Sequence, residues 1–166
     1  MNPLTVAVID PGTARIGYAL LRGPAASPEL ITAETITIPP GDGTADRLSR
    51  LARALEERLR RDRPDAVAIE KLYFSRNAKT ALAVAEARGI ILLTAHGLVP
   101  SIWEYAPLAV KIAVTGYGRA DKAHMRRAIK IILPGARLPA GDDAIDAIAI
   151  ALTAIVTKRF GPDGRR

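Results

Sequence analysis

The chain has 166 residues, no cysteine and a formal net charge of +7 at pH 7. This length predicts one domain that can bury a hydrophobic core without disulfides. The absence of cysteine excludes disulfide scaffolds, thiolate nucleophiles and cysteine zinc sites. His96 and His124 lie too far apart for an HExxH zinc site. Because the domain is basic, nucleic acid heads its candidate partners.

Neither membrane insertion nor export is expected. We expect no apolar run to reach the roughly 18 residues of a membrane span. The N-terminal residues Met1, Asn2 and Pro3 lack the basic region of a signal peptide. The expected location is therefore the cytoplasm, with no membrane partner.

Three β-strands are predicted at the start of the chain, at residues 4–9, 16–22 and 30–38. The first is a short apolar run that ends at Asp10-Pro11-Gly12, a pattern typical of a buried strand followed by a turn. Residues 23–28, rich in Pro, Gly and Ser, predict the turn between the other two. Because these connections are too short for parallel crossovers, we expect the three strands to pair antiparallel.

Helices and strands alternate in the rest of the chain. Four leucines at helical spacing predict a helix over 45–61. The other predicted elements are a strand at 66–70, a helix at 76–93, a strand at 101–105 and helices at 107–114, 120–132 and 143–159. This order indicates an α/β fold with a five-stranded mixed sheet flanked by helices. We expect one domain over 1–160 and a frayed basic tail over 161–166.

Two predicted strands end in a carboxylate, with Asp10 after VAVI and Glu70 after AVAI. If the strands are neighbours, both acids emerge at the edge of the sheet where ligand sites collect. Asp143 and Asp146 are spaced to share one helix face. Turn capping and the helix dipole are alternative explanations for Asp10, Asp142 and Asp143. They explain less well why Asp146 lies within an apolar stripe.

Four converging carboxylates would repel one another unless a cation lay between them. No cysteine is available and neither histidine is placed for ligation, so oxygen ligands favour Mg²⁺ or Mn²⁺. Two such ions about 4 Å apart can activate a water and stabilise a leaving oxygen. On a basic protein, this site predicts a nuclease.

Five segments occur in an order and spacing that is specific as a set. They are IDPGTARIGYAL at 9–20, RPDAVAIEKLYFSRNAKTAL at 63–82, ARG at 87–89, WEYAPLAVKIAVTGYGRADK at 103–122 and DDAIDAIAIALT at 142–153. With these segments the chain resembles the RuvC family of Holliday-junction resolvases over residues 4–157. The resemblance implies a ribonuclease H-like fold and an endodeoxyribonuclease that resolves four-way DNA junctions. Paired symmetric nicks by two-metal hydrolysis, in homologous recombination and DNA repair, are the implied reaction.

The resemblance also implies the site residues. The catalytic acids and metal ligands correspond to Asp10, Glu70, Asp143 and Asp146. Mg²⁺ is the implied cofactor, with Mn²⁺ as an alternative, and two ions are expected per site. Lys122 corresponds to a lysine that serves catalysis and DNA contact. Asp142 is a neighbouring acid, and the spacing to Asp146 favours Asp143 over it as the ligand.

The expected DNA contacts lie mainly in two segments. Tyr73 corresponds to an aromatic residue that stacks on a base at the junction centre, where the family often has Phe; core packing is the alternative. The basic stretch 119–130 is expected to contact phosphates, with a solvated helix face as the alternative. The full expected set is Tyr73, Arg76, Lys111, Arg119, Lys122, Arg126 and Arg127.

A homodimer is the expected assembly. The predicted helix 76–93 runs into GIILLTAHG, a stretch more apolar than one face of a surface helix requires. Two symmetric cuts also require two active sites, which a two-fold dimer supplies. The resemblance implies the same dimer, docking to the RuvAB branch-migration helicase, and association with the bacterial nucleoid.

Three other functions compete with this interpretation. Residues 10–17 resemble the phosphate loop of sugar kinases and actin-like ATPases, but 166 residues cannot hold the second lobe of such enzymes. A related nuclease that processes ribosomal RNA precursors would share the fold. A noncatalytic DNA-binding module would share the charge, although four retained acids would repel phosphate unless they held a metal.

Overall fold

The strands form one mixed sheet in the order β3-β2-β1-β4-β5. The computed structural model describes residues 3–12, 14–39, 41, 43–71 and 78–158. Its strands are β1 (Thr5–Asp10), β2 (Arg15–Arg22), β3 (Glu29–Thr37), β4 (Ala66–Glu70) and β5 (Ile102–Tyr105). β2 pairs antiparallel with β1 and β3, whereas β4 pairs parallel with β1 and β5. The predicted antiparallel trio and mixed sheet are confirmed.

β1 and β4 form the centre of the sheet. Residues 6–9 and 66–69 have no exposed surface, since helices cover both faces of these strands. Continuous apolar runs are typical of such strands. In the parallel register Ile9 lies opposite Ile69, so the next residue of each strand emerges at the same edge. The two predicted strands with acidic ends are therefore neighbours.

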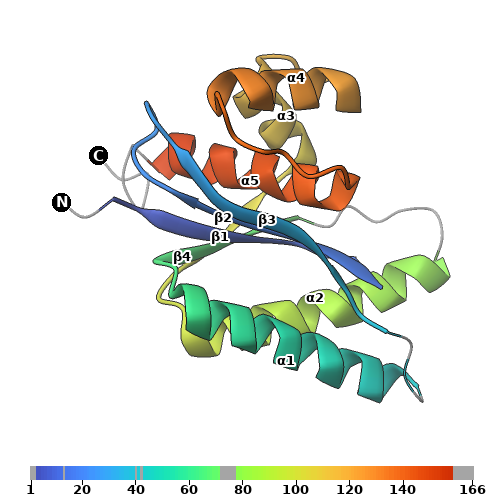
Figure 1. The fold of residues 1–166 in the computed structure, drawn as a ribbon. Helices are drawn as coiled ribbons and strands as arrows, with labels where there is room; N and C mark the ends of the chain where they lie inside the picture. Colours follow the sequence, from blue (N-terminus) through green and yellow to red (C-terminus); the bar gives the residue numbers. More distant parts are fainter. Residues whose placement is uncertain (1–2, 13, 40, 42, 72–77, 159–166) are drawn as a thin grey trace, which may run out of the picture.

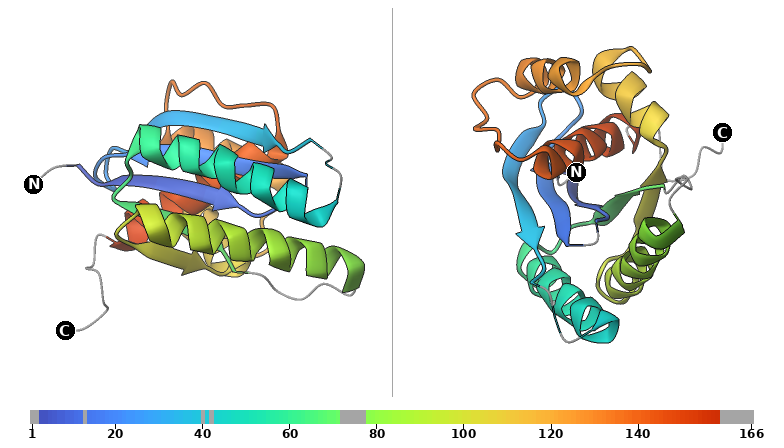
Figure 2. Two further views of the ribbon diagram at one scale, coloured as in Figure 1. Left: turned by 90° about the horizontal axis from the view of Figure 1, so that it is seen from below. Right: turned by 90° about the vertical axis from the view of Figure 1, so that its right-hand side faces the viewer.

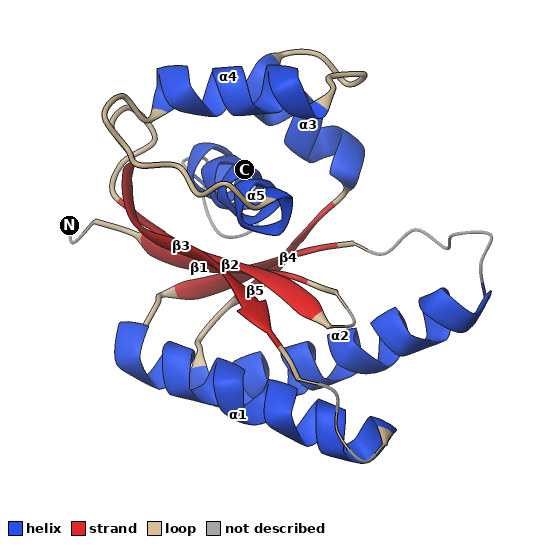
Figure 3. Cartoon of the chain, turned by 45° about the vertical axis from the view of Figure 1, so that its right-hand side comes forward, coloured by secondary structure: helices blue, strands red, loops and turns tan. Residues whose placement is uncertain are grey.

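The helices make two further layers, one on each face of the sheet (Figures 1 and 2). α1 (Thr44–Asp62) and α2 (Ala78–Leu98) cover one face. α5 (Asp142–Lys158) crosses the other face, and α3 (Pro107–Thr115) and α4 (Lys122–Ile132) pack outside it (Figure 3). Each face has its own apolar core, and alternate residues of β1 point into one or the other: Val6 and Val8 toward α5, Ala7 and Ile9 toward α1.

α2 departs from its predicted bounds. It continues to Leu98, past the predicted end at residue 93, so His96 lies on the helix and not beyond it. Over Ala81–Leu98 it is long and apolar enough to cross a membrane by length and composition alone, although no such run was expected from the sequence. Ala87, Ile91 and Ala95 recur every four residues and are buried in the core beneath the sheet. Packing of this stripe explains why the helix continues through the apolar stretch.

Candidate active site

Asp10 and Glu70 end the neighbouring parallel strands β1 and β4. Both side chains are partly exposed, although the residues before them are fully buried. The strands therefore deliver two carboxylates to one edge of the sheet. This is the edge at which open α/β sheets collect ligands.

Gly17 brings the start of α5 to the same edge. It pairs with Asp10 across β1 and β2, and a Cβ atom added to it would overlap the backbone carbonyl of Asp143. Only a residue without a side chain allows the helix to lie this close to the strand. The first turns of α5 then hold Asp143 and Asp146 beside the two strand ends.

Burial, together with repulsion among the acids, raises the pKa values of Asp10, Glu70 and Asp146. Burial raises the pKa of Asp10 to about 8, with further contributions from Glu70, Asp146 and Asp143. Burial, and then Asp146, raise the pKa of Glu70. The pKa of Asp146 is also raised, first by burial. Such a cluster requires positive charge nearby in order to be ionised at neutral pH.

A pocket of about 410 Å³ opens among these groups. Its lining residues are Asp10, Glu70, Pro107, Val110, Lys111, Ala120, Asp121, Lys122, Met125, Asp146, Ala149 and Ile150. Two lysines, from α3 and the start of α4, thus face three of the four predicted acids. Both lysines offset part of the rise in the pKa of Asp146, and Lys122 offsets part of the rise for Asp10.

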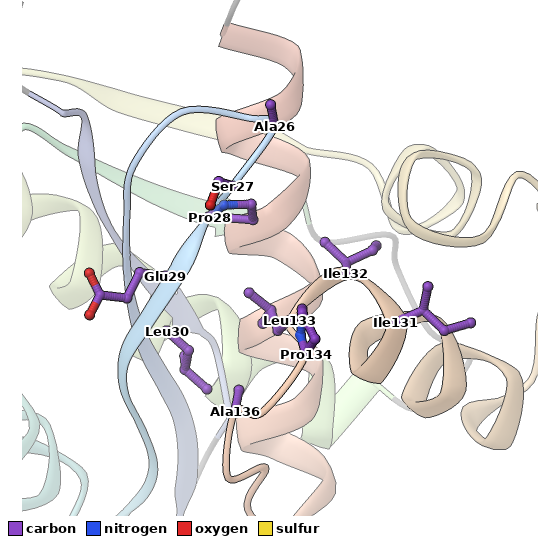
Figure 4. A pocket seen from close by; sticks show the side chains of 10 residues that line it. All are labelled: Ala26, Ser27, Pro28, Glu29, Leu30, Ile131, Ile132, Leu133, Pro134 and Ala136. Atoms are coloured by element: carbon purple, nitrogen blue, oxygen red, sulfur yellow. The ribbon is translucent and has the colours of Figure 1, made fainter.

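A second pocket, of about 670 Å³, lies between the β2–β3 turn and the end of α4 (Figure 4). Glu29 is the one ionisable group among its lining residues. This pocket lies at the opposite end of the sheet from the acids. Arg22, beside the β2–β3 turn, pairs with Thr5 at the start of β1, whereas Asp10 ends that strand. Its size alone therefore does not make it a site for chemistry.

Basic side chains contact the acids at the start of α5. Arg15 Nη2 lies 3.0 Å from Asp143 Oδ2, and Lys122 Nζ donates to Asp142 Oδ2 at 2.7 Å. This hydrogen bond is the main cause of the lowered pKa of Asp142 and the raised pKa of Lys122. Asp142, the exposed acid next to Asp143, therefore accepts a hydrogen bond from Lys122.

The donor set has the chemistry of a hard-cation site, with carboxylate oxygens and no thiolate. Within the described residues, no three acidic or histidine side chains are already arranged to hold an ion. Asp143 is turned to Arg15 instead. The acids fit a divalent cation in type and location. To bind the ion, the Asp143 carboxylate would have to leave its ion pair with Arg15.

The expected DNA-contact residues are distributed unevenly. Lys111 lines the pocket, and Arg119 and Arg127 are exposed on the α3–α4 turn and on α4. Arg126 donates hydrogen bonds to the backbone carbonyls of Pro139 and Ala140. Tyr73 and Arg76 lie outside the described residues.

Two residues of this site were missed by sequence reasoning. Arg15, paired with Asp143, lies in a segment assigned only to a turn and strand. Gly17 carries a detectable signal, because a glycine inside a predicted strand often marks a close backbone approach.

Residues 6–154 match the protein family described as crossover junction endodeoxyribonuclease RuvC. A protein of that name from Syntrophomonas wolfei is 44% identical over 87% of this chain and 84% of its own length. One from Chloroflexus aurantiacus is 42% identical over 92% of this chain and 96% of its own.

Solved structures give the same result. Thermus thermophilus RuvC in complex with a Holliday junction substrate is 33% identical, with a TM-score of 0.85 over 94% of this chain and 96% of that one. The yeast mitochondrial Holliday junction resolvase Ydc2 is 13% identical, with a TM-score of 0.68 over 93% of this chain and 78% of that one. The second similarity concerns the fold alone.

Proposed function

Because the chain belongs to the RuvC family of crossover junction endodeoxyribonucleases, we propose that it resolves four-way DNA junctions by paired, symmetric nicks. The predicted ribonuclease H-like fold is confirmed by the match to the Thermus protein. One observation carries the proposal: acids from β1, β4 and α5 face lysines from α3 and α4 across one pocket. This arrangement suits hydrolysis of a phosphodiester in homologous recombination and DNA repair.

Members of the family are metal-dependent nucleases. We propose Mg²⁺, or alternatively Mn²⁺, with two ions per site held by Asp10, Glu70, Asp143 and Asp146. When bound, such ions supply a nucleophilic water and neutralise the leaving oxygen. The raised pKa of Asp10 supports this assignment, because burial and the neighbouring carboxylates disfavour its ionised form, and a bound cation would offset that cost.

Lys122 and Lys111 would hold the scissile phosphate in the pocket. Lys122 is exposed and lines the pocket, and its ammonium donates to Asp142 Oδ2 at 2.7 Å. A phosphate oxygen would compete with Asp142 for that ammonium. Once its ammonium is held against the phosphate, Lys122 would stabilise the negative charge that develops during cleavage.

The wider DNA surface would extend along α4 and the preceding turn. Arg119, Lys122 and Arg127 are exposed there and are proposed to contact backbone phosphates. Tyr73 and Arg76 are proposed to act at the junction centre, by base stacking and phosphate contact.

The proposed assembly is a homodimer of one-domain chains over 1–160. Leu82 and Leu93 on α2 are 65% and 71% exposed, and the range Ala81–Leu98 has a mean hydropathy as high as that of a membrane span. A second copy would cover them and supply the second active site. We further propose action in the bacterial cytoplasm on nucleoid DNA, and docking of the RuvAB helicase.

The test is incubation with a synthetic four-way DNA junction in Mg²⁺ or Mn²⁺. We expect paired nicks at symmetric positions, and none in chelator or with Asp10→Asn. Cutting that persists in Asp10→Asn would overturn the site assignment. Cleavage of structured RNA without junction cleavage would favour the ribosomal RNA alternative, and binding without any cleavage would favour the noncatalytic module.

A further inference from the structure

Arg126 on α4 is bonded to the loop that precedes α5. Its Nη1 donates to the carbonyl of Pro139 at 2.9 Å, and its Nη2 donates to the carbonyl of Ala140 at 3.1 Å. Nη2 also lies 3.6 Å from Asp142 Oδ1. Both terminal nitrogens of the guanidinium therefore face the four-residue stretch 139–142, and the side chain is only 31% exposed.

Lys122 makes a parallel contact from one turn earlier on α4. It binds Asp142 Oδ2 at 2.7 Å, whereas Arg126 approaches Oδ1 of the same carboxylate. Residues four apart share a helix face, so one face of α4 holds the loop and the first residue of α5 together. Asp121 fixes the start of that face, since its side chain accepts the backbone N–H of His124 at 2.7 Å.

The start of α5 is thus held between two layers. Beneath it, Gly17 allows the helix to rest directly on β2. Above it, Arg126 binds carbonyls of the two residues before Gly141, whose own carbonyl accepts the N–H of Ile145 in the first turn of the helix. A shift of this loop would move Asp143 and Asp146 relative to Asp10 and Glu70, which are fixed by the sheet.

We propose that Arg126 is a positioning residue for the metal site and that Asp142 is its accessory, a role distinct from the phosphate contact expected from sequence. By holding the loop and the start of α5, Arg126 sets the distance between the helix acids and the strand acids. The planar fork of arginine serves two carbonyls at once, which a lysine ammonium does less well. The proposal rests on the proposed metal site.

The expected effect of Arg126→Gln is weaker metal binding with unchanged DNA contact. Loss of a group that orients metal ligands lowers metal affinity by about 10- to 100-fold. We expect at least a tenfold higher Mn²⁺ concentration for half-saturation of the DNA-free protein, measured by electron paramagnetic resonance. The Mn²⁺ concentration for half-saturation of Arg126→Lys should lie between those of Arg126→Gln and the wild type.

Arg127→Gln is the matched comparison, because Arg127 is the adjacent, exposed arginine of α4. Junction affinity is measured in chelator as a function of salt. Arg127→Gln should weaken binding and reduce the salt slope by about one, while its Mn²⁺ half-saturation stays at the wild-type value. Arg126→Gln should keep the junction affinity and salt slope of the wild type but require more Mn²⁺ for half-saturation.

Equal Mn²⁺ half-saturation in Arg126→Gln and the wild type, or no Mn²⁺ binding by either, would overturn the proposal. So would a loss of junction affinity and salt slope that matches Arg127→Gln. Thermal melting curves show whether each variant is folded. If Arg126→Gln is unfolded, the Mn²⁺ half-saturation and junction affinity of Arg126→Lys are compared with those of the wild type instead. If the wild type bound Mn²⁺ but did not cut junctions, the proposed substrate would fail while the positioning role could still be measured.

Discussion

Replacement of Asp10 by asparagine is expected to stabilise the metal-free protein while it abolishes cleavage. Burial, followed by repulsion from Glu70, Asp146 and Asp143, raises the pKa of the Asp10 carboxyl from 3.8 to about 8. Because the raised value belongs to the folded state, folding favours the protonated acid. As pH rises above 3.8 the carboxyl ionises in the unfolded chain but stays protonated in the folded one, so the free energy of unfolding falls until the pH reaches about 8.

The magnitude follows from the same shift. Each pKa unit corresponds to about 1.36 kcal/mol, and roughly three units separate the unfolded value from pH 7. The cost of Asp10 at pH 7 is then about 4 kcal/mol. Asparagine removes the charge but keeps a polar group in the same place, so we expect a gain of about 2–4 kcal/mol. For a chain of this length, that is a rise of several degrees in Tm.

The assay is urea unfolding in chelator between pH 4 and pH 9. The stability difference between Asp10→Asn and the wild type should be small near pH 4, grow up to about pH 8 and then remain level. Glu57→Gln, at an exposed acid of α1, is the control and should give no such trend. Added Mg²⁺ should stabilise the wild type more than Asp10→Asn. A less stable Asp10→Asn at pH 7.5, or a difference independent of pH, would refute the reasoning.

Three further substitutions test separate parts of the fold. Gly17→Ala should lower both Tm and the cleavage rate, because its Cβ would overlap the start of α5. Gly89→Ala on α2 is the control: no atom lies within 4 Å of the added carbon, so the cleavage rate should be unchanged and Tm unchanged or slightly raised. Leu93→Lys should give a monomer near 17.7 kDa by light scattering, against a dimer for the wild type; a dimeric variant would contradict the α2 interface. Tyr18→Phe should cost about 1 kcal/mol in urea unfolding, because it deletes the 2.6 Å hydrogen bond from the buried Tyr18 hydroxyl to Asp62; unchanged stability would contradict that role.

Local periodicity predicted most of the fold because it reports burial directly. The strand ends at Asp10 and Glu70 and the leucine stripe of α1 are short-range patterns, and both were placed correctly. The end of α2 was misplaced because the apolar run after Gly89 carries no periodic signal, and only packing in three dimensions shows which side chains are covered.

The site divides in the same way. The positions of the four acids follow from strand ends, helix spacing and resemblance. The partners of those acids do not, because Arg15 meets Asp143 across more than a hundred residues of sequence. The DNA contact predicted for Arg126 stays a prediction, whereas its hydrogen bonds to Pro139 and Ala140 were not foreseen, because a charge run looks the same whether its members face solvent or a loop carbonyl. Such contacts depend on tertiary placement, which local sequence does not encode.

The order of the elements has a consequence for synthesis of the protein. Asp10 and Glu70 belong to β1 and β4, which leave the ribosome early, whereas Asp143 and Asp146 belong to α5, the last helix described. Until that helix is released and docks on Gly17, a nascent chain holds only two of the four acids of the proposed site. If the four acids form the active site, as proposed, the nuclease becomes active only after the rest of its domain has been made.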